Sequence, residues 1–135
     1  AARWYRLAAA QGHVSAQYSL GVMYLFGRGV TQNNAEAARL FLLAAEQGDA
    51  SAQKNLGLMY KNGDSVEQSD SEAVKWFRRA AEQEHGPAQF SLGLMYEEGR
   101  GVPKNVKTAI EWYRKGAASG DERAKTSLER LGASS

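Results

Sequence analysis

The sequence predicts an all-α fold, a solenoid of antiparallel helix pairs, and two recurring blocks of residues predict it. The first block reads AQYSLGVMYLFGRGV, AQKNLGLMYKNGDSV and AQFSLGLMYEEGRGV and begins at Ala16, Ala52 and Ala88, with offsets of 36 residues. The second block has the same period and begins at Trp4, Leu40, Trp76 and Trp112. A fixed period of this length is typical of helical repeat arrays, in which each repeat buries its apolar faces against its neighbours.

We expect one repeat domain over residues 1–135. Residues 1–15 form the second helix of a truncated repeat, residues 16–51, 52–87 and 88–123 are full repeats, and residues 124–135 form a C-terminal capping helix. In that last helix Glu129 replaces the glycine that each full repeat has at this position, which favours a closing cap. The chain starts at Ala1 without an initiator Met, and we therefore interpret it as a piece of a longer protein.

The first helix of each repeat has an apolar stripe and a glycine stop. In the first full repeat Ala16, Leu20, Met23 and Tyr24 lie at i, i+4, i+7 and i+8, which is one face of an α-helix. A glycine follows the tyrosine by three residues, at the place where a left-handed residue commonly ends a helix. The three glycines are Gly27, Gly63 and Gly99.

The second helix of each repeat has its own start signal. Asn33-x-x-Glu36 and Ser69-x-x-Glu72 are predicted capping boxes, in which two side chains each satisfy a backbone N–H of the first turn. In the third repeat Asn105 keeps its place, but a threonine replaces the glutamate. Small and aromatic residues alternate along the predicted buried stripe, as close helix packing requires. The stripe is Ala37, Leu40, Phe41, Ala44, then Ala73, Trp76, Phe77, Ala80, then Ala109, Trp112, Tyr113, Gly116.

One junction departs from the pattern. Gly12, Gly48 and Gly120 are predicted to end the second helices, and the matching residue at the remaining junction is Glu84. A residue with a Cβ costs about 1 kcal/mol in the left-handed region. We therefore predict backbone strain at Glu84.

Composition excludes several classes of protein. The formal net charge is +2, from 17 basic and 15 acidic residues, and this even balance argues against a nucleic-acid surface. The absence of cysteine excludes disulfides, thiolate metal sites and a cysteine nucleophile. No apolar run is long enough for a transmembrane helix.

Three local patterns suggest chemistry, and each has a simpler explanation. Ser51-x-x-Lys54 matches a signature of penicillin-recognising serine enzymes, but the companion S-D-N and K-T-G motifs are absent. His13 and His85 share a repeat position with aspartates, so we expect them at helix N-caps rather than at a metal. The Gly-Arg-Gly segments follow helices and are turns rather than phosphate loops. We therefore predict no catalytic residues, no cofactor and no metal.

These blocks resemble the Sel1-like repeats, which are relatives of the tetratricopeptide repeat. The resemblance rests on A-x-x-x-L-G-x-M-Y-x-x-G-x-G-V followed by A-x-x-W-Y/F-x-x-A-A-x-x-G, and it covers nearly the whole chain. It implies a right-handed superhelix whose first helices line a concave side. It also implies an adaptor or scaffold for a protein or peptide, with the bacterial periplasm or secretion favoured by resemblance alone. One branch of the family is rich in cysteine, and its properties do not carry over to this sequence.

If first helices line a groove, their second face is the candidate partner-binding surface. The residues at these positions differ between repeats. They are apolar in the first full repeat, mainly basic or amide-bearing in the second, and partly acidic in the third. They are Tyr18, Val22, Leu25, Phe26, then Lys54, Asn55, Leu58, Lys61, Asn62, then Phe90, Leu94, Glu97, Glu98. For Val22, Leu58 and Leu94, packing of helix against helix along the stack is the favoured explanation, whereas for Tyr18, Leu25, Phe26 and Phe90 an interface is favoured.

Three function classes remain open from the sequence. The first is a non-catalytic scaffold for a protein or peptide. The second is a serine acylase or β-lactamase-like activity at Ser51 and Lys54. The third is polysaccharide or cell-wall binding, because the rings of Tyr18, Phe26 and Phe90 can stack on sugars.

Overall fold

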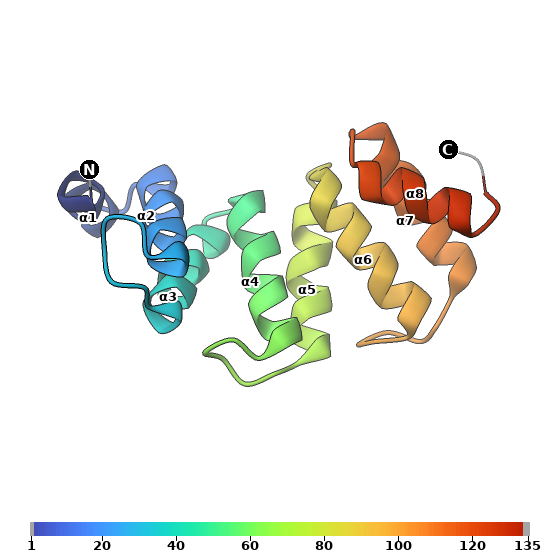
Figure 1. The fold of residues 1–135 in the computed structure, drawn as a ribbon, viewed down its shortest axis with the longest axis horizontal. Coiled ribbons are helices and arrows are strands. Elements are labelled where there is room, and N and C mark those ends of the chain that lie inside the picture. The colour runs from blue at the N-terminus through green and yellow to red at the C-terminus, as the bar shows by residue number, and fades with distance from the viewer. Residues whose placement is uncertain (1, 134–135) are drawn as a thin grey trace. The chain divides into compact units, whose positions relative to one another are not determined.

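The computed structural model describes residues 2–133 of the chain. Over these residues eight helices and no strands follow one another through short turns (Figure 1). They are α1 Ala2–Ala10, α2 Val14–Phe26, α3 Asn34–Glu46, α4 Ala50–Asn62, α5 Asp70–Ala81, α6 Gly86–Glu98, α7 Val106–Ala118 and α8 Glu122–Arg130. The predicted all-α fold of helix pairs with a 36-residue repeat is confirmed.

The helices fall into two compact halves, each described here by itself. The N-terminal half is Ala1–Gln68 and contains α1 to α4, and the C-terminal half is Ser69–Ser135 and contains α5 to α8. Helices α2, α4, α6 and α8 are first helices of the repeat pattern, and α1, α3, α5 and α7 are second helices. The expectation that residues 1–135 form a single repeat domain stays a prediction.

The helix starts follow the predicted N-caps, with one correction. The side chain of Asn33 accepts a hydrogen bond from the Glu36 N–H, and Ser69 and Asn105 act in the same way. The reciprocal half of the first capping box is wrong. The Asn33 N–H donates instead to the Tyr24 carbonyl oxygen at 2.9 Å, and the Glu36 carboxylate pairs with Arg39 at 2.6 Å. Because the Tyr24 carbonyl oxygen of α2 already accepts the bond from the Asn33 N–H, this N–H is not available to the Glu36 carboxylate.

The helix stops are confirmed, and the structure adds one left-handed loop residue that the sequence analysis missed. Gly27, Gly63 and Gly99 end their helices with φ of 67°, 71° and 68°. Glu84 has φ 62°, so the predicted left-handed non-glycine residue is present. Ser65, with φ 59°, is a second one and occupies the repeat position of Gly29 and Gly101.

Close approach of small residues to rings builds the core of each half. In the N-terminal half a Cβ on Gly21 would lie 2.8 Å from Phe41 Cε1, and Phe41 has no exposed surface. In the C-terminal half a Cβ on Gly93 would lie 2.6 Å from the ring of the fully buried Tyr113. Most of the predicted stripe of the second helices is buried as expected.

Trp112 is the exception in that stripe, because its side chain is only half-buried. It lines an open pocket together with Glu82, Glu84 and Lys115. The Lys115 ammonium lies 4.4 Å from the centroid of the indole ring. This is a cation–π contact, and it partners the ring of a tryptophan that the core does not fully cover.

Candidate partner-binding surfaces

Helix α2 carries the most exposed apolar side chain among the thirteen candidate positions. The Phe26 side chain is 60% exposed at the last turn of α2, and the Arg28 guanidinium lies 5.1 Å from the ring centroid. Val22 and Leu25 on the same helix are half-buried. The first helix of this repeat therefore ends in an exposed ring next to a cation.

Tyr18 belongs partly to the core rather than wholly to the surface. Its ring packs against Phe41 with centroids 5.8 Å apart and an angle of 43° between the ring planes. Phe41 is fully buried between this ring and Gly21. A substitution at Tyr18 would therefore disturb packing as well as any binding surface.

Helix α4 presents a polar set in the same half of the chain. Asn62 is exposed, and the other four candidates, Lys54, Asn55, Leu58 and Lys61, are half-buried. The loop after α4 is fastened to it, because the Gln68 side-chain amide donates to the Lys61 carbonyl oxygen at 3.2 Å. Gln32 makes the corresponding bond to the Leu25 carbonyl oxygen at 3.3 Å.

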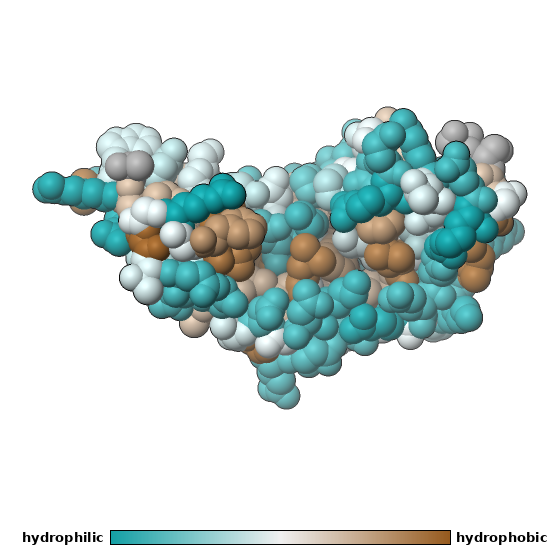
Figure 2. Space-filling view, viewed as in Figure 1, coloured by the Kyte–Doolittle hydropathy of each residue, from teal (hydrophilic) through white to brown (hydrophobic). Residues whose placement is uncertain are grey.

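Helix α6 carries candidates that are mostly engaged inside the C-terminal half. The Phe90 ring lies 5.9 Å from the Tyr113 ring, and the Arg123 guanidinium lies 4.5 Å from the Phe90 centroid. Leu94 packs against the same buried cluster as Phe90. Glu98 is the exposed candidate of this helix. Figure 2 shows brown apolar side chains bordered by teal polar ones on the visible face of this half.

Glu97 on α6 joins a polar network with α7 and α8. It accepts hydrogen bonds from the Tyr113 hydroxyl at 2.6 Å and from the Arg130 guanidinium at 2.7 Å. The bond from Arg130 holds the pKa of the Glu97 carboxyl below its ordinary value. Burial, followed by the contact with Glu97, raises the pKa of the Tyr113 hydroxyl. Glu97 therefore stabilises the packing of α8 and is only secondarily available to a partner.

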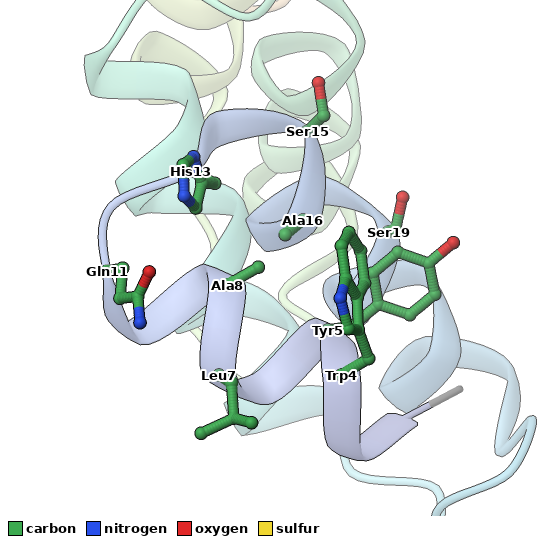
Figure 3. A pocket seen from close by; sticks show the side chains of 9 residues that line it. All are labelled: Trp4, Tyr5, Leu7, Ala8, Gln11, His13, Ser15, Ala16 and Ser19. Carbon is green, nitrogen blue, oxygen red and sulfur yellow. The ribbon is translucent and has the colours of Figure 1, made fainter.

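The structure adds a surface that the sequence analysis did not assign. A pocket of about 700 Å³ lies between α1 and α2, and its lining is mostly apolar (Figure 3). Two side chains beside it are strongly exposed, Trp4 at 65% and Leu7 at 60%. We call it the N-terminal groove; it is lined by Trp4, Tyr5, Leu7, Ala8, Gln11, His13, Ser15, Ala16 and Ser19. The start of the second-helix pattern at Trp4, in mid-repeat, was the sequence signal for it.

The residues considered for catalysis and metal binding lie on ordinary structural elements. Ser51 and Lys54 lie three residues apart in the first two turns of α4. His13 and His85 occupy the N-cap positions of α2 and α6, in different halves, and neither makes a side-chain cap bond. Within residues 2–133 no group of three or more His, Asp or Glu is placed to hold a metal ion.

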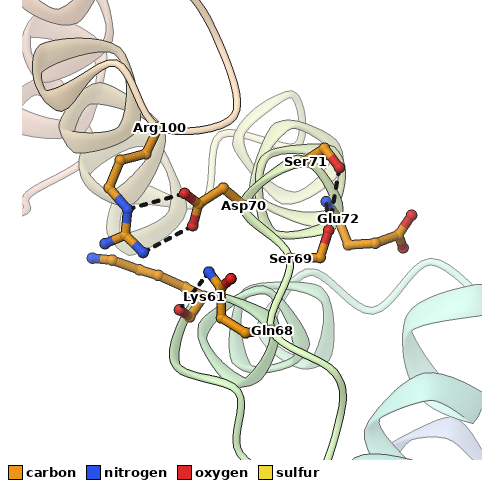
Figure 4. A network of polar contacts seen from close by, with 7 residues as sticks. All are labelled: Lys61, Gln68, Ser69, Asp70, Ser71, Glu72 and Arg100. Carbon is orange, nitrogen blue, oxygen red and sulfur yellow. Dashed lines mark hydrogen bonds and ion pairs between the residues drawn. The ribbon is translucent and has the colours of Figure 1, made fainter.

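The Gly-Arg-Gly segment after α6 is a structural turn. Arg100 pairs with Asp70 at the start of α5, with Nη2 to Oδ1 at 2.8 Å and Nε to Oδ2 at 3.2 Å (Figure 4). A Cβ on the next residue, Gly101, would lie 2.5 Å from the Asp70 carbonyl oxygen. This bidentate pair fastens the loop to α5 rather than cradling a phosphate.

Comparison with known proteins relates the whole array to one family. The family model for the Sel1 repeat matches residues 1–13, 14–49, 50–85 and 86–121. The matched repeats begin two residues before those expected from the sequence blocks and keep the same period. A search of curated proteins finds no match. Within the described residues no helix has both the length and the apolar character needed to cross a bilayer.

Three solved structures resemble the chain over nearly its full length. The c5321 protective antigen of uropathogenic Escherichia coli, described as an SLR fold, has 43% identity and a TM-score of 0.92; the match covers 96% of this chain and 28% of the antigen. A Sel1 repeat protein from Oxalobacter formigenes has 43% identity and a TM-score of 0.84, with 93% and 95% covered. Helicobacter pylori cysteine rich protein B has 25% identity and a TM-score of 0.74, with 94% and 96% covered. The chain thus spans little more than a quarter of the antigen.

Proposed function

The chain belongs to the Sel1 repeat family, and from that premise we propose that it is a non-catalytic scaffold that binds a protein or peptide in a concave groove lined by the second face of its first helices. Sel1 repeat proteins are generally protein-interaction scaffolds and are typically not enzymes. The finer proposal concerns which residues bind. Each of α2, α4 and α6 has one exposed candidate at its last residue, and these are Phe26, Asn62 and Glu98.

The exposed ring of Phe26 is the observation that carries the proposal. It occupies the same repeat position as Asn62 and Glu98, so one structural position presents an aromatic, an amide and a carboxylate. The fold does not require an aromatic side chain at this position, because the two other full repeats have an asparagine and a glutamate there. An exposed aromatic beside an arginine is the composition typical of an interface hot spot.

The half-buried neighbours give the surface its rigid base. Leu25 and Val22 lie on α2, whose opposite face is fixed in the core through Leu20 and Gly21. A ligand that covers Phe26 would therefore meet a surface that is already ordered. Preorganisation of this kind lowers the entropic cost of binding.

The test begins with peptides selected from a displayed library on the intact chain. Affinity is then measured by calorimetry for the chain and for the double variant Leu25→Asp, Phe26→Ser. We expect at least about tenfold weaker binding in the double variant, since interface anchors commonly contribute more than 1 kcal/mol. The matched control is Val106→Ser, which removes a 39% exposed apolar side chain from a second helix.

Two outcomes would contradict the proposal. Equal affinities for the chain and the double variant, with both folded by circular dichroism, would place binding elsewhere. Nitrocefin hydrolysis by the pure chain that disappears in Ser51→Ala would replace a scaffold by an enzyme. Retained hydrolysis in Ser51→Ala would indicate a contaminant and leave the binding result to decide.

A further inference from the structure

A pocket in the C-terminal half combines an aromatic ring with two carboxylates. It has a volume of about 590 Å³ and lies where the end of α5, the start of α6 and the end of α7 meet. The tryptophan in its wall is half-buried, and both carboxylate side chains are exposed. We call it the Trp112 pocket; its aromatic and polar lining consists of Glu82, Glu84, Gln89, Trp112, Lys115 and Ser119.

The ring and the carboxylates are particular to this half of the chain. In the N-terminal half Ala10 and Gly12 occupy the repeat positions of the two glutamates. Leu40 occupies the position of Trp112, and only 2% of its surface is exposed. The repeat fold therefore forms without these three side chains, and their presence together in one pocket needs another explanation.

A shorter side chain at the end of α7 leaves space beside the tryptophan. In the N-terminal half the Gln47 amide donates to the Gln17 side-chain oxygen at 2.7 Å. At the same repeat position of α7 the Ser119 hydroxyl donates to the Gln89 side-chain oxygen at 3.0 Å. The hydroxyl keeps the hydrogen bond but fills less volume than a glutamine side chain. The pocket therefore has a fixed polar lining and room for a ligand.

The tryptophan of the neighbouring second helix shows what this ring position attracts. Trp76 on α5 has the repeat position of Trp112 and is 3% exposed. Two cations lie over its ring, the Arg79 guanidinium at 4.7 Å and the Lys75 ammonium at 5.1 Å from the centroid. The negative face of an indole ring attracts cations in this way.

Trp112 keeps one of these two cations. Lys115 has the repeat position of Arg79, and its ammonium lies 4.4 Å from the ring centroid. Glu111 has the repeat position of Lys75, so a carboxylate replaces the second cation. Among the residues that the structure describes, Lys115 is the single cation over this ring, which is half-buried. Part of the ring therefore remains open to a further cation.

We infer that the Trp112 pocket binds the guanidinium group of an arginine side chain presented by a protein partner. The guanidinium plane stacks on the open part of the ring, and its N–H groups donate to Glu82 and Glu84. A guanidinium fits better than an ammonium, because it is planar, weakly hydrated and able to form paired hydrogen bonds with a carboxylate. The pocket belongs to other helices than Phe26 and does not rest on the proposed scaffold function.

Glu84 holds its place at the pocket against the preference of its backbone. Its φ is 62°, whereas Gly12, Gly48 and Gly120 occupy the same position at the other junctions. A residue kept in a strained conformation is often part of a functional site. Glycine at this position would relieve the strain and remove one of the two carboxylates. Glu84→Gly should therefore weaken arginine binding while it relieves the strain.

Lys115 acts as an internal competitor for the ring. Its side chain is exposed, so its ammonium can leave the ring for water without exposing a buried charge. Removing this charge should free the face of Trp112 and make the pocket more negative. Binding of an external cation should therefore become stronger in Lys115→Met. A pocket that binds an anion would respond in the opposite direction.

Two small probes of the same shape test the inference. N-acetyl-arginine amide carries the guanidinium, and N-acetyl-citrulline amide replaces it by a neutral urea group. Binding is followed through the NMR signal of the Trp112 indole N–H, assigned by its loss in Trp112→Phe. We expect a saturable shift with the arginine probe and at least about tenfold weaker binding of the citrulline probe. Equal binding of the two probes, or no shift with the arginine probe, would overturn the inference.

Protein variants locate the binding. The double variant Glu82→Gln, Glu84→Gln should weaken binding of the arginine probe at least about fivefold, since each exposed ion pair contributes a few-fold at most. The matched control Glu129→Gln neutralises an exposed glutamate of α8 and should leave the affinity unchanged. Lys115→Met should strengthen binding at least about threefold. Equal losses in the double variant and the control, or weaker binding in Lys115→Met, would overturn the inference.

Two further probes identify the source and the charge of the ligand. Free arginine carries the main-chain charges that a residue inside a protein lacks, and we expect it to bind no more tightly than the capped probe. Tighter binding of free arginine, by about tenfold, would overturn the assignment to a protein side chain. Binding of N-acetyl-glutamate amide in preference to the arginine probe would overturn the assignment to a cation.

Discussion

Glu97 of α6 and Arg130 at the end of α8 form an ion pair of 2.7 Å, although 33 residues separate them in sequence. The same carboxylate oxygen accepts the hydrogen bond from Tyr113, so α7 and α8 are both joined to α6 through one acceptor. The pair is partly exposed, with 52% of the Arg130 side chain in solvent, and salt will therefore screen it.

This pair predicts a loss of stability in acid. The folded pKa of Glu97 lies below its ordinary value of 4.5, so the pair stabilises the fold above that pH. The contribution is lost as the pH falls from 4.5 through the lowered folded pKa. We expect Arg130→Ala to lower the free energy of unfolding in urea at pH 7 and to change it much less at pH 3.

The control for the acid prediction is Arg3→Ala, which removes an exposed arginine of α1. It should have a small effect at both pH values. An Arg130→Ala chain whose deficit is the same at pH 7 and pH 3 would contradict the assignment to the ion pair.

Glu84 predicts a stabilising substitution at the end of α5. Its φ of 62° is in the left-handed region, where glycine avoids the strain of a Cβ. Glu84→Gly should raise the free energy of unfolding by up to about 1 kcal/mol, reduced by the greater freedom of glycine in the unfolded chain. Urea denaturation monitored by circular dichroism measures the change.

Gly120 provides the matched reverse substitution. It has φ 92° at the same repeat position, and a Cβ there would meet nothing within 4 Å. Gly120→Ala therefore tests backbone strain without a steric clash, and we expect it to destabilise the chain by about 1 kcal/mol. If both substitutions shift stability in the same direction, the strain explanation is wrong.

His13 predicts a second stabilising substitution, at the N-cap of α2. Its backbone has the extended geometry of a cap, with φ −72° and ψ 113°, but its side chain makes no cap bond. Asp49 has nearly the same angles and accepts a bond from the Ala52 N–H at 2.8 Å. His13→Asp should therefore raise the melting temperature, through about 0.5–1.5 kcal/mol of cap energy.

Asp49→Ala is the matched control for the cap prediction. It should cost about 1 kcal/mol by removing the cap bond of α4. A folded His13→Asp chain of unchanged or lower stability, together with the expected loss in Asp49→Ala, would show that the α2 terminus does not need this cap.

The sequence predicted those parts of the fold that repeat locally. The left-handed glycines such as Gly27, the N-cap of Asn33 and the small-to-aromatic stripe around Phe41 each depend on neighbours within one helix pair. The repeat period and the local helix signals of the sequence are therefore enough to predict these features. The sequence located the candidate binding positions but not their exposure. The burial of Phe90 and Glu97 depends on contacts with α7 and α8, which are distant in sequence.

What the sequence analysis missed depends on contacts across the repeat boundary. Gln17, Gln53 and Gln89 are buried, and their amides donate to carbonyl oxygens of Ala9, Ala45 and Ala81 at 3.0–3.2 Å. The recurrence of Ala-Gln was visible in the sequence. Its meaning required the position of the preceding helix end, which amphipathic spacing alone does not supply.

The buried glutamine gives the last prediction. Gln89 donates to the Ala81 carbonyl oxygen and accepts from the Ser119 hydroxyl, so it joins the end of α5 to the end of α7. Gln89→Met keeps the length of the side chain but leaves a backbone carbonyl without this partner. We expect a loss of about 1–3 kcal/mol in the free energy of unfolding, the cost typical of an unsatisfied buried polar group.

Lys125→Met, at the same repeat position of α8, is the matched control. It replaces an exposed residue and should change the free energy of unfolding by less than about 0.5 kcal/mol. Equal effects of these two substitutions would show that the Gln89 amide contributes packing volume rather than hydrogen bonds.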